Sequence, residues 1–60
     1  MYEYKIIDNS PENESIKVGK ATLQQLKVIL PHDVYELLLM PGTISIKEDA
    51  GNESYEISKV

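Results

Sequence analysis

The 60-residue sequence contains no cysteine, tryptophan, phenylalanine or arginine. Without cysteine there is no disulfide framework, no zinc finger and no thiol nucleophile. The longest apolar run, residues 37–40, has four members, whereas a membrane helix needs roughly 18. Glu3 and Lys5 interrupt the first apolar residues, which does not fit a signal peptide. We therefore expect a cytoplasmic protein without a membrane partner.

The balance of charge narrows the class of partner. Ten acidic residues against six basic ones give a formal net charge of −4, and every basic residue is a lysine. Arginine supplies the bidentate fork that reads guanine edges and phosphates, so its absence removes the usual tool of base readout. A net-negative surface also repels the nucleic-acid backbone. We expect no direct binding of nucleic acid.

The composition is that of an ordinary globular protein. Hydrophobic residues make up 42% of the chain and charged residues 27%, which argues against disorder and low complexity. At this length the sequence predicts one small domain over residues 1–60.

Alternation of side-chain character predicts strands at both ends of the chain. Residues 2–8 and 15–20 alternate with period two around a turn at 9–14, which contains Pro11. Residues 43–47 and 54–59 repeat the pattern around a second turn at 49–52. We interpret each pair as a hairpin.

The middle of the chain has helical spacing. Thr22 and Gln25 match a capping box, and Leu23, Leu26 and Leu30 form one stripe. Pro31 cannot continue that helix, so the pattern predicts two short helices, or one helix kinked at Pro31. The resulting order is ββααββ. It indicates an α+β fold with the helix packed on one face of a small antiparallel sheet.

The predicted inward-facing residues follow from these stripes. They are Tyr4, Ile6, Ile16, Val18, Leu23, Leu26, Leu30, Val34, Leu37, Leu38, Ile44, Ile46, Tyr55 and Ile57.

Several apolar residues fall outside the predicted core stripes. A helix that is apolar around most of its circumference is normally covered on more than one side. Small chains without disulfides or metal often gain the burial they need by oligomerisation. We predict a self-association surface, most simply in a two-fold homodimer, formed by Val28, Tyr35, Leu39, Met40 and Ile7. The alternative is that these residues complete the core of a single chain.

The sequence contains no recognisable catalytic or ligand-binding pattern, so we expect neither an enzyme nor a cofactor. His32 is the sole histidine, and Pro31 and Asp33 beside it suit a helix start better than a catalytic dyad. One histidine without cysteine cannot build a zinc site. The chain lacks a phosphate-binding glycine loop, and residues 8–14 lack the central glycine of a calcium loop. We expect no catalytic, cofactor-binding or metal-binding residues.

Six of the ten carboxylates lie in or beside the two predicted turns. If the hairpins are neighbours, these residues form one negative rim. The rim either keeps the protein soluble or binds a basic protein surface. Its members are Asp8, Glu12, Glu14, Glu48, Asp49 and Glu53.

In size, charge and element order, residues 15–48 resemble the small acidic phage inhibitors of uracil-DNA glycosylase. In that family apolar residues plug the cleft of the enzyme, and the resemblance implies a DNA-mimicking inhibitor. The present chain has no Phe or Trp to serve as a plug and shares no motif with the family residue by residue.

These observations support three hypotheses. The first is a small acidic protein without catalytic activity that acts by protein–protein contact, as a homodimer, in the manner of a phage or bacterial accessory protein. The second is an acidic inhibitor of a nucleic-acid-processing enzyme. The third is a structural unit that assembles with its own copies.

Overall fold

Four strands and two helices in the order ββααββ make up the described part of the chain, residues 1–12 and 14–60 of a computed structural model. This order confirms the predicted α+β fold. Asn13, which belongs to the first predicted turn, lies outside the described residues. The elements are β1 (Tyr2–Asn9), β2 (Glu14–Ala21), α1 (Leu23–Ile29), α2 (His32–Leu38), β3 (Ser45–Ala50) and β4 (Glu53–Lys59).

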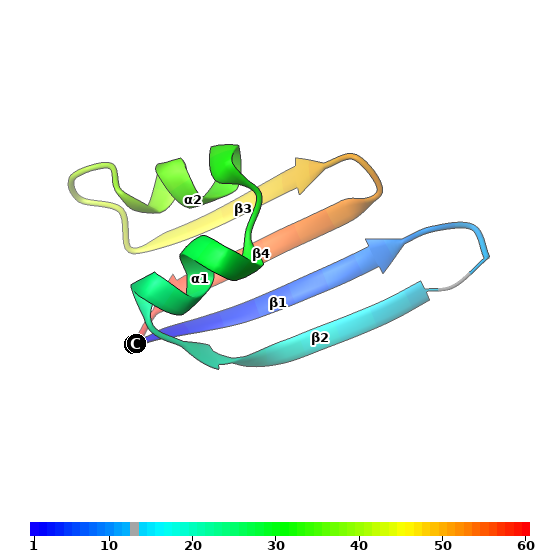
Figure 1. The fold of residues 1–60 in the computed structure, drawn as a ribbon, viewed down its shortest axis with the longest axis horizontal. Helices are drawn as coiled ribbons and strands as arrows, with labels where there is room; N and C mark the ends of the chain where they lie inside the picture. The colour runs from blue at the N-terminus through cyan, green and yellow to red at the C-terminus, as the bar shows by residue number, and fades with distance from the viewer. Residues whose placement is uncertain (13) are drawn as a thin grey trace.

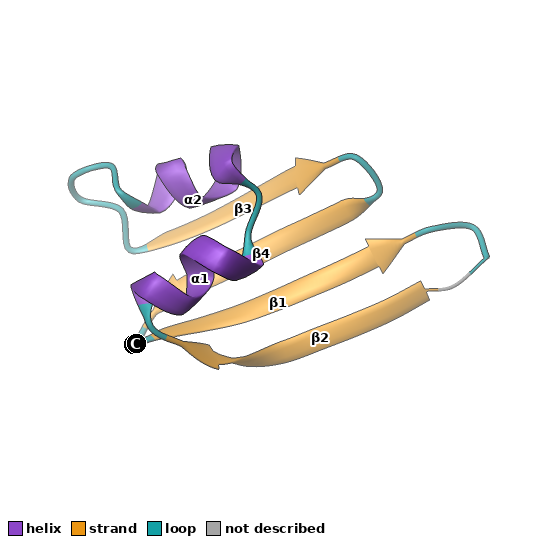
Figure 2. Ribbon diagram, viewed as in Figure 1, coloured by secondary structure: helices purple, strands orange, loops and turns teal. Residues whose placement is uncertain are grey.

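The strands form one antiparallel sheet in the order β2-β1-β4-β3, with both helices on one face (Figures 1 and 2). The two hairpins meet along β1 and β4, so the first and last strands of the chain are the central pair. β2 and β3 are the outer strands. α1 contacts β2 and α2 contacts β3, while the opposite face of the sheet is open.

The register of the central pair decides which residues reach the core. Tyr4 lies opposite Ile57 and Ile6 lies opposite Tyr55, all on the helix-bearing face. Because successive strand residues point to opposite faces, Lys5 and Glu56 share the open face. The alternation predicted for residues 2–8 is therefore confirmed.

The core lies between this face and the inner stripes of both helices. Leu26 of α1, Val34 of α2 and Ile57 of β4 are the largest side chains with almost no exposed surface. The buried apolar residues of the described chain are Ile6, Ala21, Leu26, Leu30, Val34, Leu38, Tyr55 and Ile57.

The inward assignment of Ile16 and Val18 in β2 was wrong. They lie opposite Ile7 and Lys5 on the open face and are 61% and 70% exposed. The pairing of β2 with β1 gives the core face instead to Gly19 and Ala21. A one-residue error in register moves every side chain to the other face.

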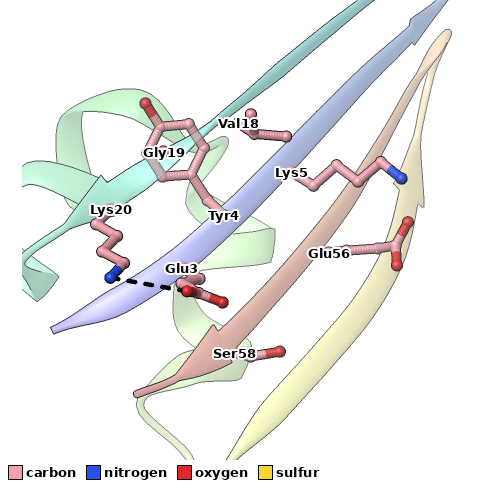
Figure 3. Close-up of a pocket in the computed structure, with 8 residues that line it drawn as sticks. All are labelled: Glu3, Tyr4, Lys5, Val18, Gly19, Lys20, Glu56 and Ser58. Carbon is pink, nitrogen blue, oxygen red and sulfur yellow. Dashed lines mark ion pairs between the residues drawn. The ribbon is translucent and has the colours of Figure 1, made fainter.

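Small residues in β2 make room for neighbours on the helix-bearing face. A Cβ atom built on Gly19 would lie 2.7 Å from the Tyr4 hydroxyl, because the tyrosine ring crosses β2 at this point (Figure 3). The ring covers a strand position that has no side chain of its own. Ala21, 3% exposed, is the residue of β2 that is buried in the core, whereas Val18 is exposed.

The prediction for the third strand was shifted. β3 begins at Ser45 and continues to Ala50, so Ile44 precedes the strand and is 74% exposed, contrary to its predicted inward position. The turn is shorter than expected: Gly51 takes a positive φ of 63° in the connection to β4. Glycine reaches this left-handed conformation at little cost.

Local signals explain why the helical region forms two helices. The Thr22 hydroxyl accepts from the Gln25 backbone N–H at 3.2 Å, and the Gln25 side chain accepts from the Thr22 N–H at 2.8 Å, so the capping box is confirmed. α1 ends at Ile29, its C-cap Leu30 is extended, and Pro31 is the N-cap of α2. Proline restricts the preceding residue to extended conformations, which separates the helices. Each has seven residues, and no helix of the described chain is long and apolar enough to cross a membrane.

We expect Leu26→Ala to lower the free energy of unfolding by about 2–5 kcal/mol, because it opens a cavity at a fully buried position. Gln24→Ala is the matched control on the same helix. Gln24 is exposed, so its truncation should change stability by less than about 0.5 kcal/mol. Urea unfolding followed by circular dichroism measures both. Equal losses for the two variants would contradict the observed orientation of α1.

Candidate functional site

The two hairpin connections lie side by side at one end of the molecule (Figure 1). Asp8 near the end of β1 is directly opposite Glu53 at the start of β4, and the Asn9 backbone N–H donates to the Asn52 carbonyl at 2.7 Å. The Asn9 side chain also donates to the Ser54 hydroxyl at 3.1 Å. The structure thus brings the acidic segments together at one end.

The acidic residues surround this end rather than occupying one face of the sheet. By register, Asp8, Glu53 and Glu48 belong to the helix-bearing face, whereas Glu14 and Asp49 belong to the open face. Glu12 lies in the connection between β1 and β2. We call these six residues the acidic rim: Asp8, Glu12, Glu14, Glu48, Asp49 and Glu53.

Like charges directly opposite each other in a sheet are destabilising, and Asp8 faces Glu53 in this way. One oxygen of Asp8 is held by the Ser10 backbone N–H at 3.0 Å. Lys17 of β2 lies on the same side, and it lines a hollow of about 320 Å³ together with Asp8 and Glu53. The sequence places no lysine within either acidic segment, so this positive charge becomes visible only once β2 is paired with β1.

Tyr55 is the core residue next to the acidic rim. It is 4% exposed, and its burial raises the pKa of its hydroxyl above the usual range. The negative charge of Glu53 raises this pKa further, and that of Asp8 adds a smaller contribution in the same direction. Tyr55 therefore links the core to the charge of the rim.

The five residues predicted to form a self-association surface do not lie together. Val28 is on the outer side of α1, whereas Leu39 and Met40, 52% and 58% exposed, follow α2 in its connection to β3. Tyr35 is partly buried against the core. Ile7 lies on the open face of the sheet, away from the helices.

Four of the nine large apolar residues that are exposed in the described chain belong to β2 or to the adjacent α1: Ile16, Val18, Val28 and Ile29. On the helix-bearing side, Val28 and Ile29 line a hollow of about 420 Å³ between α1 and β2, together with Tyr4, Lys20, Ala21 and Gln25. On the open face, Ile16 and Val18 lie beside Ile7 and Lys5 of β1. The prediction missed Ile16 and Val18 because it assigned them to the core. Small Gly19 and Ala21, on the alternate positions, were the available sign that α1 packs over those positions.

A further hollow of about 460 Å³ lies beside Tyr4, partly on the open face (Figure 3). The Lys20 ammonium lies 3.9 Å from the Glu3 carboxylate, and these side chains are 64% and 57% exposed. Lys5 and Glu56 lie opposite each other in neighbouring strands. The remaining lining residues are Val18, Gly19 and Ser58. The Lys20–Glu3 pair is exposed, and exposed ion pairs of this kind contribute little to stability.

His32, the one histidine, opens α2 and is exposed. Its Nε2 atom is 2.9 Å from a carboxylate oxygen of Glu36, one turn further along the helix. This is an ordinary pair between neighbouring turns of a helix. Within residues 1–12 and 14–60, no group of three or more His, Cys, Asp or Glu side chains is placed to hold a metal ion.

Searches of protein-family models, curated proteins and solved structures found no match to this chain.

The stability of the protein should fall above about pH 10 partly through Tyr55. The folded-state pKa of Tyr55 is raised, so the unfolded chain releases this proton first as the pH increases. The contribution of Tyr55 to the free energy of unfolding is fully present below the pKa that this residue has in the unfolded chain. It is lost as the pH rises through the higher pKa of the folded state. Tyr55→Phe, which cannot ionise, should show a shallower alkaline loss in urea titrations between about pH 8 and 11. Identical slopes for wild type and variant would contradict this origin.

Proposed function

We propose that this chain is a small acidic protein without catalytic activity that acts in the cytoplasm through protein–protein contact, as a homodimeric accessory protein of phage or bacterial type. The observation that carries the proposal is the apolar surface left uncovered on the β2 and α1 side of the fold. Ile16, Val18 and Val28 are 61%, 70% and 87% exposed there. Large contiguous apolar patches are rare on the surfaces of soluble monomers.

The size of the fold gives a physical reason for self-association. Short chains bury a smaller fraction of their surface on folding than long chains do, and many gain additional burial from a second subunit. Each square ångström of apolar surface that leaves water contributes roughly 25 cal/mol. Bringing two β2 sides together would remove from water residues that the core of one chain does not reach.

The charged groups fit a binding role better than a catalytic one. Among the charges that line the hollow beside Tyr4, Lys20 and Glu3 form an exposed ion pair, and Lys5 and Glu56 lie opposite each other in neighbouring strands. His32 lies on α2 beside Glu36, away from the residues that line this hollow. A catalytic constellation needs a nucleophile, a base and an orienting group within hydrogen-bond reach. The proposed function therefore assigns no catalytic role to these charged residues.

In solution we expect the mass of two chains, measured by light scattering after size exclusion at micromolar to millimolar concentrations. Val28→Glu should shift the distribution towards one chain, because it introduces charge on the β2 and α1 side. Leu39→Glu, at an exposed position after α2, is the matched control and should leave the mass unchanged. The mass of a single chain at every concentration would refute the homodimer.

The acidic rim favours a second candidate function, that of an inhibitor of a nucleic-acid-processing enzyme. Its specific support is the adjacency of the two connections, with Asp8 opposite Glu53 and the Asn9 N–H bonded to Asn52. Close carboxylates at one end of a small fold imitate spaced phosphates and attract a basic groove. The contact would be weakened by salt because it is electrostatic.

The inhibitor hypothesis predicts salt-sensitive binding to a bacterial uracil-DNA glycosylase, the enzyme class suggested by the resemblance in size and charge. Neutralising Glu12, Glu14, Asp49 and Glu53 to Gln or Asn should weaken binding at least tenfold in titration calorimetry. The control neutralises Asp33 and Glu56, which lie outside the rim, and should bind like wild type. Equal affinity of both variants, or no binding by the wild type at low salt, would remove this candidate.

A further inference from the structure

The two outer strands of the sheet are protected very differently. β3 carries the consecutive charges Lys47, Glu48 and Asp49, and α2 packs against it. Charged residues and a covering helix are common means by which proteins prevent an outer strand from pairing with another chain. α1 also contacts β2, but five successive residues of this strand, from Glu14 to Val18, are exposed. β2 is therefore the side on which another strand can be added.

We infer that β2 pairs antiparallel with β2 of a second copy, with the two Lys17 residues opposite each other on the two-fold axis. This inference deepens the proposed self-association and rests on it. It identifies the contact as a continuous sheet through both chains. An axis perpendicular to the sheet keeps both helical layers on the same face, because residues opposite each other in adjacent strands point to the same side.

The sequence of β2 is complementary to itself in this register. Ile16 faces Val18 of the second copy, and Val18 faces Ile16 of that copy, so apolar residues meet on the open face. Glu14 faces Lys20 of the second copy, and the reciprocal pair forms by symmetry. Opposite charges and β-branched pairs are the favourable cross-strand combinations.

The partner strand also extends contacts already present within one chain. Ile7 lies beside Ile16 in the β1–β2 ladder, so the apolar row would continue from Ile7 through Ile16 to Val18 of the second copy. Lys20 lies opposite Glu3, and their charged groups are 3.9 Å apart. Glu14 of the second copy would add a carboxylate on the other side of that lysine.

Neighbouring registers lose this complementarity. An axis at Val18 sets Ile16 against Lys20 and Glu14 against Thr22. An axis at Ile16 sets Val18 against Glu14. The register at Lys17 has one unfavourable contact, the two lysines on the axis. Each lysine lines the hollow that also contains Asp8 and Glu53, whose negative charges offset the repulsion.

Cysteine cross-linking tests this register directly, since the chain has no cysteine of its own. Directly opposite residues have Cβ atoms about 4.5–5.5 Å apart, close to what a disulfide requires. Under mild oxidation Lys17→Cys should form a covalent dimer at least tenfold faster than Lys47→Cys. Lys47 is the matched control, an exposed lysine on the other outer strand. Equal rates, or faster cross-linking of Val18→Cys than of Lys17→Cys, would overturn the inferred register.

Charge exchange between chains provides an independent test. Glu14→Lys alone and Lys20→Glu alone each place like charges opposite one another at two symmetric positions. Each variant should dimerise about tenfold more weakly than wild type. Mixing the two restores opposite charges at both positions, so an equimolar mixture should form heterodimers of wild-type affinity. Lys47→Glu is the control for a change of net charge.

These experiments distinguish the β2 contact from self-association through any other surface. If the wild type dimerises and neither charge variant dimerises more weakly, the β2 contact is overturned while self-association stands. The same conclusion holds if both variants are weakened but mixing them does not restore the wild-type affinity. A wild type that remains a single chain at millimolar concentration overturns the proposed homodimer together with the β2 contact. Circular dichroism of each variant establishes that the fold is intact before its mass is compared.

Discussion

The pairing of β1 with β4 is the constraint on which the rest of the structure depends. It joins two hairpins that are far apart in sequence and makes the first and last strands the centre of the sheet. Its register places Ile6 beside Tyr55 and Tyr4 beside Ile57, which defines the face that the helices cover. The same pairing sets the two hairpin connections next to each other and leaves β2 and β3 as the outer strands. Core, acidic rim and exposed strand are thus three consequences of one long-range contact.

Both helices depend on this sheet for their stability. Isolated helices of seven residues are not stable in water, so α1 and α2 form because Leu26 and Val34 are buried against the strands. The core so formed is one-sided, and the open face keeps its apolar residues in solvent. Ile16 and Val18 are then available to another chain, and they share this face with Lys5 and Glu56. The proposed function follows from this division of the apolar residues.

The acidic rim and the exposed strand suggest different kinds of contact. Carboxylates such as Asp8 and Glu53 act over several ångströms and are screened by salt, so they govern rates and choice of partner. An open strand with apolar side chains acts only on direct contact and contributes mainly to the lifetime of a complex. The rim surrounds the hairpin end, and β2 runs along the side of the sheet (Figure 1). A dimer formed through β2 would carry two such rims, which is compatible with an additional basic partner.

Local patterns in the sequence determined the order of elements, the capping box at Thr22, the separation of the helices at Pro31 and the inward alternation of Tyr4 and Ile6. These depend on near neighbours along the chain, whose geometry is set by dihedral preferences and hydrogen bonds within a few residues. The face taken by Ile16 and Val18 was decided only by tertiary structure. A strand of alternating apolar and small residues fits either face, and pairing with β1 and packing of α1 select between them. The meeting of Asp8 with Glu53 likewise arises only when β1 and β4, which are far apart in sequence, become neighbours. Lys17 joins the hollow that these two residues line only once β2 has paired with β1.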